Sequence, residues 1–280
     1  MAKLPPLPGT TGRRDWRTAF DALRKLLANG DDTGQVFRIM RSLNVGDTAE
    51  AYARLIATPE GGRMAYERVE LARRFADRDW VNGFAPGTVG AAYRDFLDTT
   101  GYSADGLVEV SRLDPSETDV IHPYAWMGRR TRDVHDIWHV LTGYKADETM
   151  GEACLVAFSY AQTRGLGWAF IATGAALKSI RETGGTLLAK AVREGYRNGK
   201  RAAWLLGEDY EALMHEPLDA ARARLGLDMA PYLAGPVAAD IVLIQRSRTD
   251  SDLIVQLALD RATLELAPLG VGARHMADDR

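Results

Sequence analysis

A chain of 280 residues, 46% of them hydrophobic and 26% charged, has the composition of an ordinary folded protein and can form one large domain or two small ones. Its formal net charge of -3 at pH 7 offers no basic field of the kind that indicates nucleic-acid binding. The single cysteine, Cys154, excludes an internal disulfide framework and a cysteine-rich zinc site, and it is consistent with a reducing compartment.

The N-terminal segment, residues 1–14, is rich in Pro and Gly and is predicted to be disordered. It lacks the apolar core of a secretory signal, and the acidic residues mixed among Arg13, Arg14 and Arg17 disfavour a mitochondrial transit peptide. No apolar run reaches the ~20 residues that span a bilayer. We therefore expect a cytoplasmic location.

The first half of the chain predicts a series of amphipathic helices. Apolar residues recur at intervals of three and four, and capping or turn residues separate the segments. The expected helices cover residues 15–27, 33–43, 47–57, 63–76, 88–100 and 103–110. Residues 59–62, Pro-Glu-Gly-Gly, are expected to form a turn, and residues 82–88 a loop.

The second half begins with a predicted irregular crossover over residues 111–127, because a residue that precedes Pro avoids the helical region. Helices are expected over residues 129–141, 152–162, 186–206 and 208–224, with a loop at 143–151 and Pro217 as a kink or boundary. Residues 165–177 predict a buried helix, with a membrane-contacting helix as the alternative. Residues 241–245 have a strand-like composition but could also close a helix. The predicted fold is all-α, with one multi-helix domain over residues 15–235 and a partly disordered extension over 236–280.

The residues that carry chemistry lie in the run His135-Asp136-Ile137-Trp138-His139. Because an α-helix turns ~100° per residue, His135, Asp136 and His139 project within one narrow arc, and two imidazoles at i and i+4 can close on one ion. Glu152 begins the next predicted helix, and a helix hairpin would return its carboxylate to that arc. This donor set favours zinc, with iron(II) or manganese as alternatives, over copper(I) or calcium. The two histidines could instead cap helices or bond to neighbouring groups.

The remaining candidates are interpreted as structural. His122 is expected in a loop, His215 near a helix end, His275 in the tail, and Cys154 in the core as a small buried side chain. The sequence has no Gly-x-Ser-x-Gly elbow, no P-loop and no complete Gly-x-Gly-x-x-Gly. The chain therefore predicts neither an acyl-transfer nor a dinucleotide-binding site.

The metal motif resembles the hallmark of the coenzyme Q (ubiquinone) biosynthesis protein 4 family, which is His-Asp-x-x-His, then eleven residues, then Glu. Three further stretches are similar to the family, and together they span roughly residues 30–230: residues 31–38, 86–108 and 195–226. One departure is that twelve residues separate His139 from Glu152 in this chain. The extra residue falls in the loop, where insertions are tolerated, so Glu152 is kept as the ligand, with Asp147 and Glu148 as possible substitutes.

The resemblance implies an all-α fold with a divalent-metal site beside an apolar pocket for a polyprenyl tail. The implied activity is (oxidative) decarboxylation at the ring carboxylate carbon of a polyprenylated 4-hydroxybenzoate-type lipid. His135, His139 and Glu152 are the expected ligands, and Asp136 is a ligand or orients a histidine. The resemblance also implies peripheral association with the inner membrane, contact with other ubiquinone-biosynthesis proteins, and a homodimer.

Two other functions are weighed. A non-catalytic polyprenyl-lipid-binding scaffold for the biosynthetic enzymes fits the same resemblance. A zinc peptidase is disfavoured because Asp136 stands where such enzymes carry a glutamate base, and no third histidine follows at the required spacing. Trp168, Phe170 and Ile171 are candidates for the pocket wall or the membrane face, with plain core as the alternative.

Overall fold

The computed structural model describes residues 12–30, 32–103 and 120–227, which belong to one compact unit. Within these ranges the chain is helical and contains no strand, so the all-α prediction is confirmed. Several predictions concern residues outside the described ranges. They are most of the helix at 103–110, residues 241–245, His275, the domain end at 235 and most of the segment 1–14.

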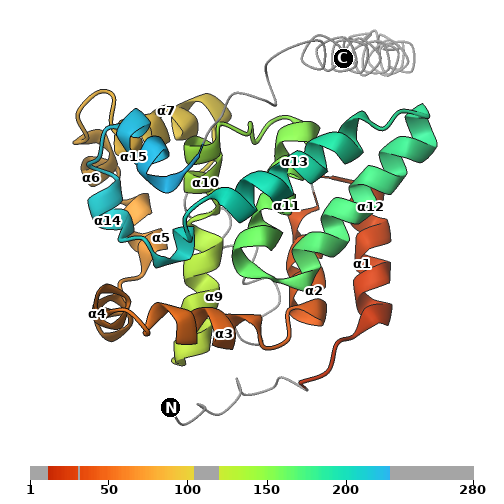
Figure 1. Cartoon of the computed structure of the whole chain (residues 1–280), viewed down its shortest axis with the longest axis horizontal. Coiled ribbons are helices and arrows are strands. Elements are labelled where there is room, and N and C mark those ends of the chain that lie inside the picture. Colours follow the sequence, from red (N-terminus) through yellow and green to blue (C-terminus); the bar gives the residue numbers. More distant parts are fainter. Residues whose placement is uncertain (1–11, 31, 104–119, 228–280) are drawn as a thin grey trace, which may run out of the picture. The chain divides into compact units, whose positions relative to one another are not determined.

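Figure 1 shows α9 and α10 following one another through the middle of this unit, with α4–α7, α14 and α15 on one side and α1, α2 and α11–α13 on the other. The elements before the central pair are α1 (Trp16–Ala28), α2 (Thr33–Leu43), α3 (Asp47–Leu55), α4 (Pro59–Glu67), α5 (Leu71–Ala76), α6 (Arg78–Asn82) and α7 (Val89–Thr100). The later elements are α9 (Pro123–Asp133), α10 (His135–Thr142), α11 (Thr149–Thr163), α12 (Leu166–Thr183), α13 (Leu187–Arg201), the 3-10 turn η1 (Leu205–Gly207), α14 (Tyr210–Leu213) and α15 (Leu218–Leu225).

The turn predicted at residues 59–62 is wrong, because these residues form the first turn of α4. Thr58 caps the helix by accepting the Gly61 N–H at 3.1 Å, and Pro59 stands at the first helical position, where its missing N–H costs nothing. The single helix predicted over 63–76 is divided by Arg68, which has a left-handed φ of 51°. The predicted loop at 82–88 is preceded by the short helix α6, which the pattern did not indicate.

The predicted crossover over 111–127 is also wrong at its end, because α9 begins at Pro123. His122 is its N-cap and accepts the Tyr124 N–H at Nδ1, 3.1 Å away. A second helix, α10, then starts after Val134, so one predicted helix over 129–141 is two in the structure. In the last predicted helix Pro217 is a boundary, since it precedes α15.

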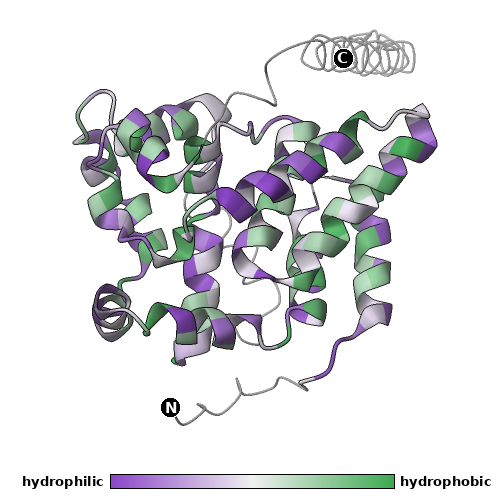
Figure 2. Cartoon of the chain, in the orientation of Figure 1, coloured by the Kyte–Doolittle hydropathy of each residue, from purple (hydrophilic) through white to green (hydrophobic). Residues whose placement is uncertain are grey.

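Glycines allow α11 and α13 to pack closely. A Cβ on Gly195 would lie 2.3 Å from the Cys154 carbonyl oxygen, and a Cβ on Gly199 would lie 2.7 Å from that of Phe158. Figure 2 shows the contrast between the two helices, since α11 is largely apolar and α13 strongly polar on its visible side. Their close contact holds α11, which carries Glu152, against the rest of the unit.

The start of α12 is held by residues distant in sequence. The side-chain oxygen of Asn44 accepts the Gly167 N–H at 2.8 Å, and Asp47 accepts the backbone N–H of Leu166. These bonds satisfy N–H groups that the first turn of a helix otherwise leaves without partners. The junction of α2 and α3 therefore fixes where α12 begins.

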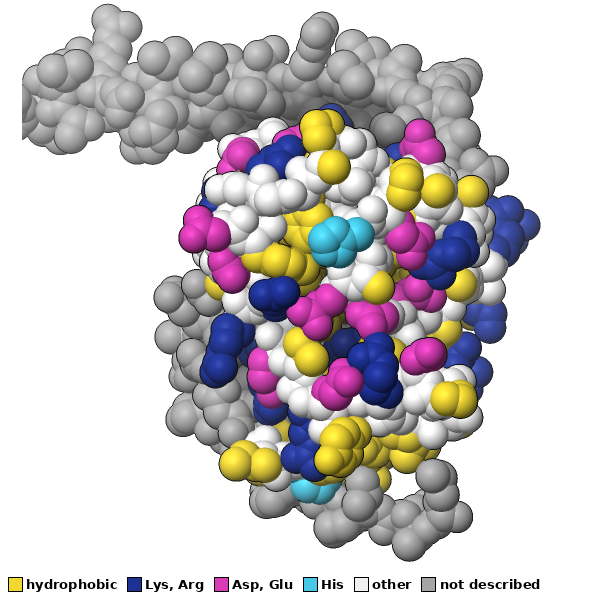
Figure 3. Space-filling model, turned by 90° about the vertical axis from the view of Figure 1, so that its left-hand side faces the viewer, with side chains coloured by type: hydrophobic (Ala, Val, Ile, Leu, Met, Phe, Trp, Pro, Cys, Tyr) yellow, Lys and Arg dark blue, Asp and Glu magenta, His cyan; other side chains and the backbone are white. Residues whose placement is uncertain are grey.

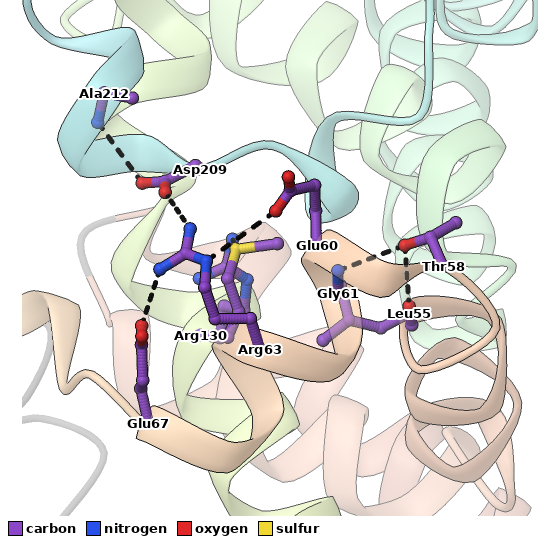
Figure 4. Close-up of polar contacts among 10 residues, drawn as sticks. Leu55, Thr58, Glu60, Gly61, Arg63, Glu67, Arg130, Asp209 and Ala212 are labelled. Carbon is purple, nitrogen blue, oxygen red and sulfur yellow. Dashed lines mark hydrogen bonds and ion pairs between the residues drawn. The ribbon is translucent and has the colours of Figure 1, made fainter.

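A buried cation, Arg130 on α9, joins the central helix to η1. It is 4% exposed, and its guanidinium donates to the backbone carbonyls of Leu206 and Glu208. Nearby, Arg63 of α4 pairs with Glu67 at 2.7 Å and with Asp209 at 2.6 Å (Figure 4). The buried arginine thus donates to backbone carbonyls and to the Met64 sulfur, whereas Arg63 pairs with carboxylates.

The surface over α4, α6 and α14 intersperses acidic and basic side chains (Figure 3), in keeping with ion pairs such as Arg224–Glu208 at 2.8 Å. No broad patch of one sign is visible on this face. Among the helices of the described residues, none has the length and apolarity needed to cross a lipid bilayer.

Candidate metal centre

Helix α10 carries both histidines on successive turns. His135 and His139 are four residues apart, and their ring centroids lie 4.9 Å from each other. The His139 side chain is 1% exposed and that of His135 is 18% exposed. The i, i+4 spacing therefore brings the two imidazoles together, as the sequence pattern predicts.

The loop of residues 143–148 reverses the chain and returns Glu152 on α11 to the histidines. Gly143 adopts a left-handed φ of 69° at the end of α10. Gly151 lets the first turn of α11 pack on the loop, since a Cβ there would lie 2.1 Å from the Lys145 carbonyl oxygen. One Glu152 carboxylate oxygen, Oε1, thereby lies 3.2 Å from Nε2 of His139.

His135, His139 and Glu152 form a group whose ligand atoms all lie within 4.8 Å of one another. Ligands held at ~2.1 Å from one cation are about 3–4 Å apart, so small side-chain rotations would close this group on an ion. Glu152 is 39% exposed at its side chain, which leaves the group accessible from one side.

The hydrogen-bonding of His139 supports a cation at this position. Nδ1 lies 2.6 Å from the Tyr144 carbonyl oxygen, an acceptor, so Nδ1 carries the proton. In the neutral form of this ring the lone pair is at Nε2, which is buried and has no hydrogen-bond partner. Nε2 lies 3.2 Å from the Glu152 oxygen, a separation at which a proton or a cation between the two atoms is favourable. The residues present therefore fit a bound divalent metal.

Asp136 lies beside this group but is not one of its three members. The side chain is 11% exposed, and its Oδ1 is 3.5 Å from Nδ1 of His135. Burial lowers the pKa of His135, but the hydrogen bond to Asp136 and the charges of Glu152 and Asp136 outweigh burial and raise it. Burial raises the pKa of Glu152, yet His139 and His135 together lower it below the usual value. Asp136 thus has the geometry of a residue that orients His135.

Aromatic rings flank the two imidazoles. Phe96 of α7 stacks on His139 with centroids 6.0 Å apart, and Trp168 of α12 stacks on His135 at 6.1 Å. Tyr102, which is 47% exposed, meets the edge of Phe96 at 6.0 Å. The group therefore lies between apolar walls contributed by two helices that are distant in sequence.

Trp168, Phe170 and Ile171, proposed together as a pocket wall or membrane face, have three different surroundings. Trp168 contacts His135, while Phe170 meets Phe20 of α1 at 4.9 Å. Ile171 is 8% exposed and belongs to the core cluster of α1, α2 and α12. Only the first of the three thus adjoins the metal group.

Several other sequence candidates lie outside the group. Glu148 pairs with Lys145 at 2.8 Å, and neither it nor the exposed Asp147 joins the histidines. His215 contacts the ring of Phe84 at the end of α14. Cys154 is fully buried, and burial raises the pKa of its thiol, in keeping with the predicted core role.

Sequence reasoning did not single out Phe96 or Tyr144. No local sequence pattern indicates that Phe96 contacts His139, because only the tertiary structure brings α7 to α10. Tyr144 follows His139 in the run Val-Leu-Thr-Gly-Tyr, where a Gly after a helix indicates a reversal that can bring the next carbonyl back to the last turn.

These features define an all-α protein with a histidine–carboxylate group on a helix hairpin that has the donor atoms to hold a metal ion. The family model described as "Coenzyme Q (ubiquinone) biosynthesis protein Coq4" matches residues 45–231. The chain therefore belongs to the Coq4 family of ubiquinone biosynthesis proteins, as its sequence motif indicates.

Relatives from several eukaryotes agree with this assignment. The mitochondrial ubiquinone biosynthesis protein COQ4 homolog of Danio rerio is 30% identical over 176 residues, which are 62% of this chain and 61% of that protein. The Mus musculus homolog is 28% identical, with 62% of each chain covered. The Yarrowia lipolytica protein is 26% identical over 224 residues, 75% of this chain and 81% of that protein. The match thus spans about three fifths of the length of the two animal relatives.

The fold also resembles a crystal structure of a candidate ubiquinone biosynthesis protein from Nostoc punctiforme PCC 73102. The TM-score is 0.57 at 21% identity, with 77% of this chain and 99% of that chain covered. At this level of identity the similarity concerns the fold alone.

Proposed function

We propose that this protein is a metal-dependent decarboxylase that acts on a polyprenylated 4-hydroxybenzoate-type lipid in ubiquinone biosynthesis. The observation that carries the proposal is the buried Nε2 of His139, which has no hydrogen-bond partner and lies 3.2 Å from the Glu152 carboxylate, with His135 beside it. Membership of the Coq4 family supplies the pathway.

The donor set supports zinc as the first candidate metal, with iron or manganese as alternatives, since imidazole and carboxylate ligands suit all three. His135, His139 and Glu152 are the proposed ligands, and Asp136 is proposed to orient His135 through Nδ1. When bound there, the cation would supply Lewis acidity toward the substrate carboxylate.

The proposed reaction breaks the bond between the ring carbon and its carboxylate and releases carbon dioxide. In the oxidative form, a hydroxyl group takes the place of the carboxylate and dioxygen accepts the two electrons. One molecule each of ring acid, dioxygen and water then gives the phenol, carbon dioxide and hydrogen peroxide. Without an oxidant, a proton takes the vacated position.

The flanking aromatic residues suit an aromatic substrate. Phe96 stacks on His139, Trp168 stacks on His135, and Tyr102 lies exposed beside Phe96. Such apolar walls offer faces and edges on which a substituted benzene ring can pack.

A polyprenyl tail is too apolar to diffuse freely in water, so we propose that the protein takes its substrate from the inner membrane as a peripheral protein. We name as the α1–α12 face the exposed apolar residues Trp16, Phe20, Leu177 and Ile180, together with the partly buried Phe170. Trp16 and Phe20 are 45% and 59% exposed and both contact Phe170 at the ring edge. The exposed Arg17 and Arg181 adjoin this face and suit anionic headgroups. A second copy of the chain, or another ubiquinone-biosynthesis protein, is the alternative occupant.

The test pairs metal analysis with turnover. Wild-type protein and His139→Ala are purified, their metal content is measured, and each is given a prenylated hydroxybenzoate under air while carbon dioxide release is followed. Stoichiometric metal and turnover, both lost in the variant, are expected. Metal that is absent, or turnover that survives its loss, would contradict the decarboxylase and leave the non-catalytic lipid-binding scaffold as the better account.

A further inference from the structure

A chain of contacts leads from His139 away from the metal group to α13. The Tyr144 carbonyl accepts the Nδ1 proton of His139 at 2.6 Å. The Tyr144 side chain is 3% exposed, and its hydroxyl accepts a hydrogen bond from Nδ2 of Asn198 at 2.8 Å. The peptide group that orients His139 therefore belongs to a residue whose side chain is anchored on a different helix.

The orientation of Asn198 is itself determined by a neighbour. Its Oδ1 accepts a hydrogen bond from the Arg201 guanidinium. Because arginine can only donate, the amide oxygen must face Arg201, and the amide nitrogen must then face Tyr144. The Asn198–Tyr144 bond thus has a defined donor and acceptor.

The backbone around Tyr144 leaves little freedom for other positions. Gly143 turns the chain with a left-handed φ of 69°, and the Tyr144 N–H lies 3.4 Å from the Thr142 hydroxyl. On the other side, Gly151 packs directly on Lys145, where a Cβ would lie 2.1 Å from its carbonyl oxygen. The carbonyl that holds His139 therefore lies in a tightly packed turn, and the bond between the Tyr144 hydroxyl and Asn198 adds a link from this turn to α13.

We infer that Tyr144, held by Asn198, is a positioning residue for the metal centre. It fixes the tautomer and ring orientation of His139 so that Nε2 lies beside the Glu152 carboxylate. Loss of a group that hydrogen-bonds to a metal-binding histidine typically lowers metal affinity by ~10–100-fold. The inference rests on the proposed metal site and names two residues outside the group of three proposed ligands.

The experiment measures Co(II) binding to the full chain, since Co(II) in a histidine–carboxylate site reports its ligand geometry in the visible spectrum. Affinities come from competition with a chelator for wild type, Tyr144→Phe, Asn198→Leu and the double variant. The matched control is Tyr160→Phe. Tyr160 of α11, like Tyr144, contacts α13 through its side chain, because it stacks on Tyr196 with ring centroids 5.7 Å apart. Thermal unfolding of each metal-free protein is recorded alongside.

Each single variant is expected to bind Co(II) about 3–30-fold more weakly with a shifted visible spectrum, since the carbonyl remains but its anchor is lost. The double variant should bind Co(II) no more weakly than the weaker-binding single variant, because both changes remove the same bond between Tyr144 and Asn198. Tyr160→Phe should match wild type.

Affinity within twofold of wild type and an unchanged spectrum, even with a lowered unfolding temperature, would show a merely structural role and overturn the inference while leaving the metal site intact. Wild type that binds no Co(II) would instead overturn the metal site, and the inference with it.

Discussion

Gly61 of α4 lies so close to Leu55 of α3 that a Cβ at Gly61 would stand 1.9 Å from the Leu55 carbonyl oxygen (Figure 4). The next residue, Gly62, has nothing within 4 Å of its Cβ position. Two adjacent glycines in one helix therefore have opposite surroundings.

Gly61→Ala should lower the free energy of unfolding by about 1–3 kcal/mol, because the backbone of α3 must move. Gly62→Ala should raise it by up to ~1 kcal/mol, since alanine loses less conformational entropy in a helix. Urea unfolding followed by circular dichroism measures both. Equal effects at the two positions would show that α4 does not pack on α3 as described.

Asp47 should make stability depend on pH. Burial raises its pKa from the usual 3.8 to about 6, although Arg14 acts in the opposite direction. The folded state then holds the proton more tightly than the unfolded state, so stability declines as pH rises from about 4 to 6. Asp47→Asn, which keeps an acceptor for Leu166, should stabilise the protein at pH 7.5 by ~0.5–1 kcal/mol after allowance for its partial exposure, and by almost nothing at pH 4.

The control for Asp47→Asn is Asp98→Asn, an exposed partner of Arg78 at 2.9 Å. It should change stability by less than ~0.5 kcal/mol at either pH. Denaturant titrations at the two pH values give the comparison. A destabilising Asp47→Asn at pH 7.5 would mean that the charge of Asp47 contributes more through Arg14 and Leu166 than its burial costs.

The role of Asp136 can be separated from that of a ligand. Because Asp136 contacts His135 rather than joining the group of three, Asp136→Asn should weaken zinc binding by ~10–100-fold. Glu152→Gln and His139→Ala should each abolish measurable binding. Calorimetric zinc titration orders the three variants. Loss of all binding in Asp136→Asn would identify Asp136 as a fourth ligand.

The α1–α12 face predicts binding to anionic phospholipid vesicles. The double substitution Trp16→Ser and Phe20→Ser should weaken co-sedimentation about tenfold or more, because two partly exposed aromatic side chains no longer insert among the lipids. Tyr66→Ser is the control, since Tyr66 is 89% exposed on α4, away from this face. Vesicle binding that survives the double substitution would point to another surface, and a change in oligomeric state would point to a second copy of the chain.

Local patterns predicted much of the helical structure. Thr88 caps α7 through its side chain, as its place before an apolar-periodic segment indicates, and Asp15, the first residue of the predicted helix 15–27, caps α1 in the same way. The helix predictions were wrong where residues that usually interrupt a helix are accommodated within one. The glycines of α4 are compatible with a helix because Thr58 and Pro59 begin it. Arg68 ends the helix in a left-handed backbone conformation, which is typical of glycine and is not predicted by an arginine.

The sequence by itself determined that His135 and His139 lie together on α10, because their spacing acts through helix geometry alone. It also determined Glu152 as the expected third ligand, through the family motif. Only the tertiary structure decided that Phe96 and Trp168 flank the imidazoles, that Asp136 turns toward His135, and that Asn198 anchors Tyr144. Apart from the contact of Asp136 with its neighbour His135, these contacts join segments far apart in the chain, and which side chains meet there depends on how close-packed helices fit together rather than on any local pattern.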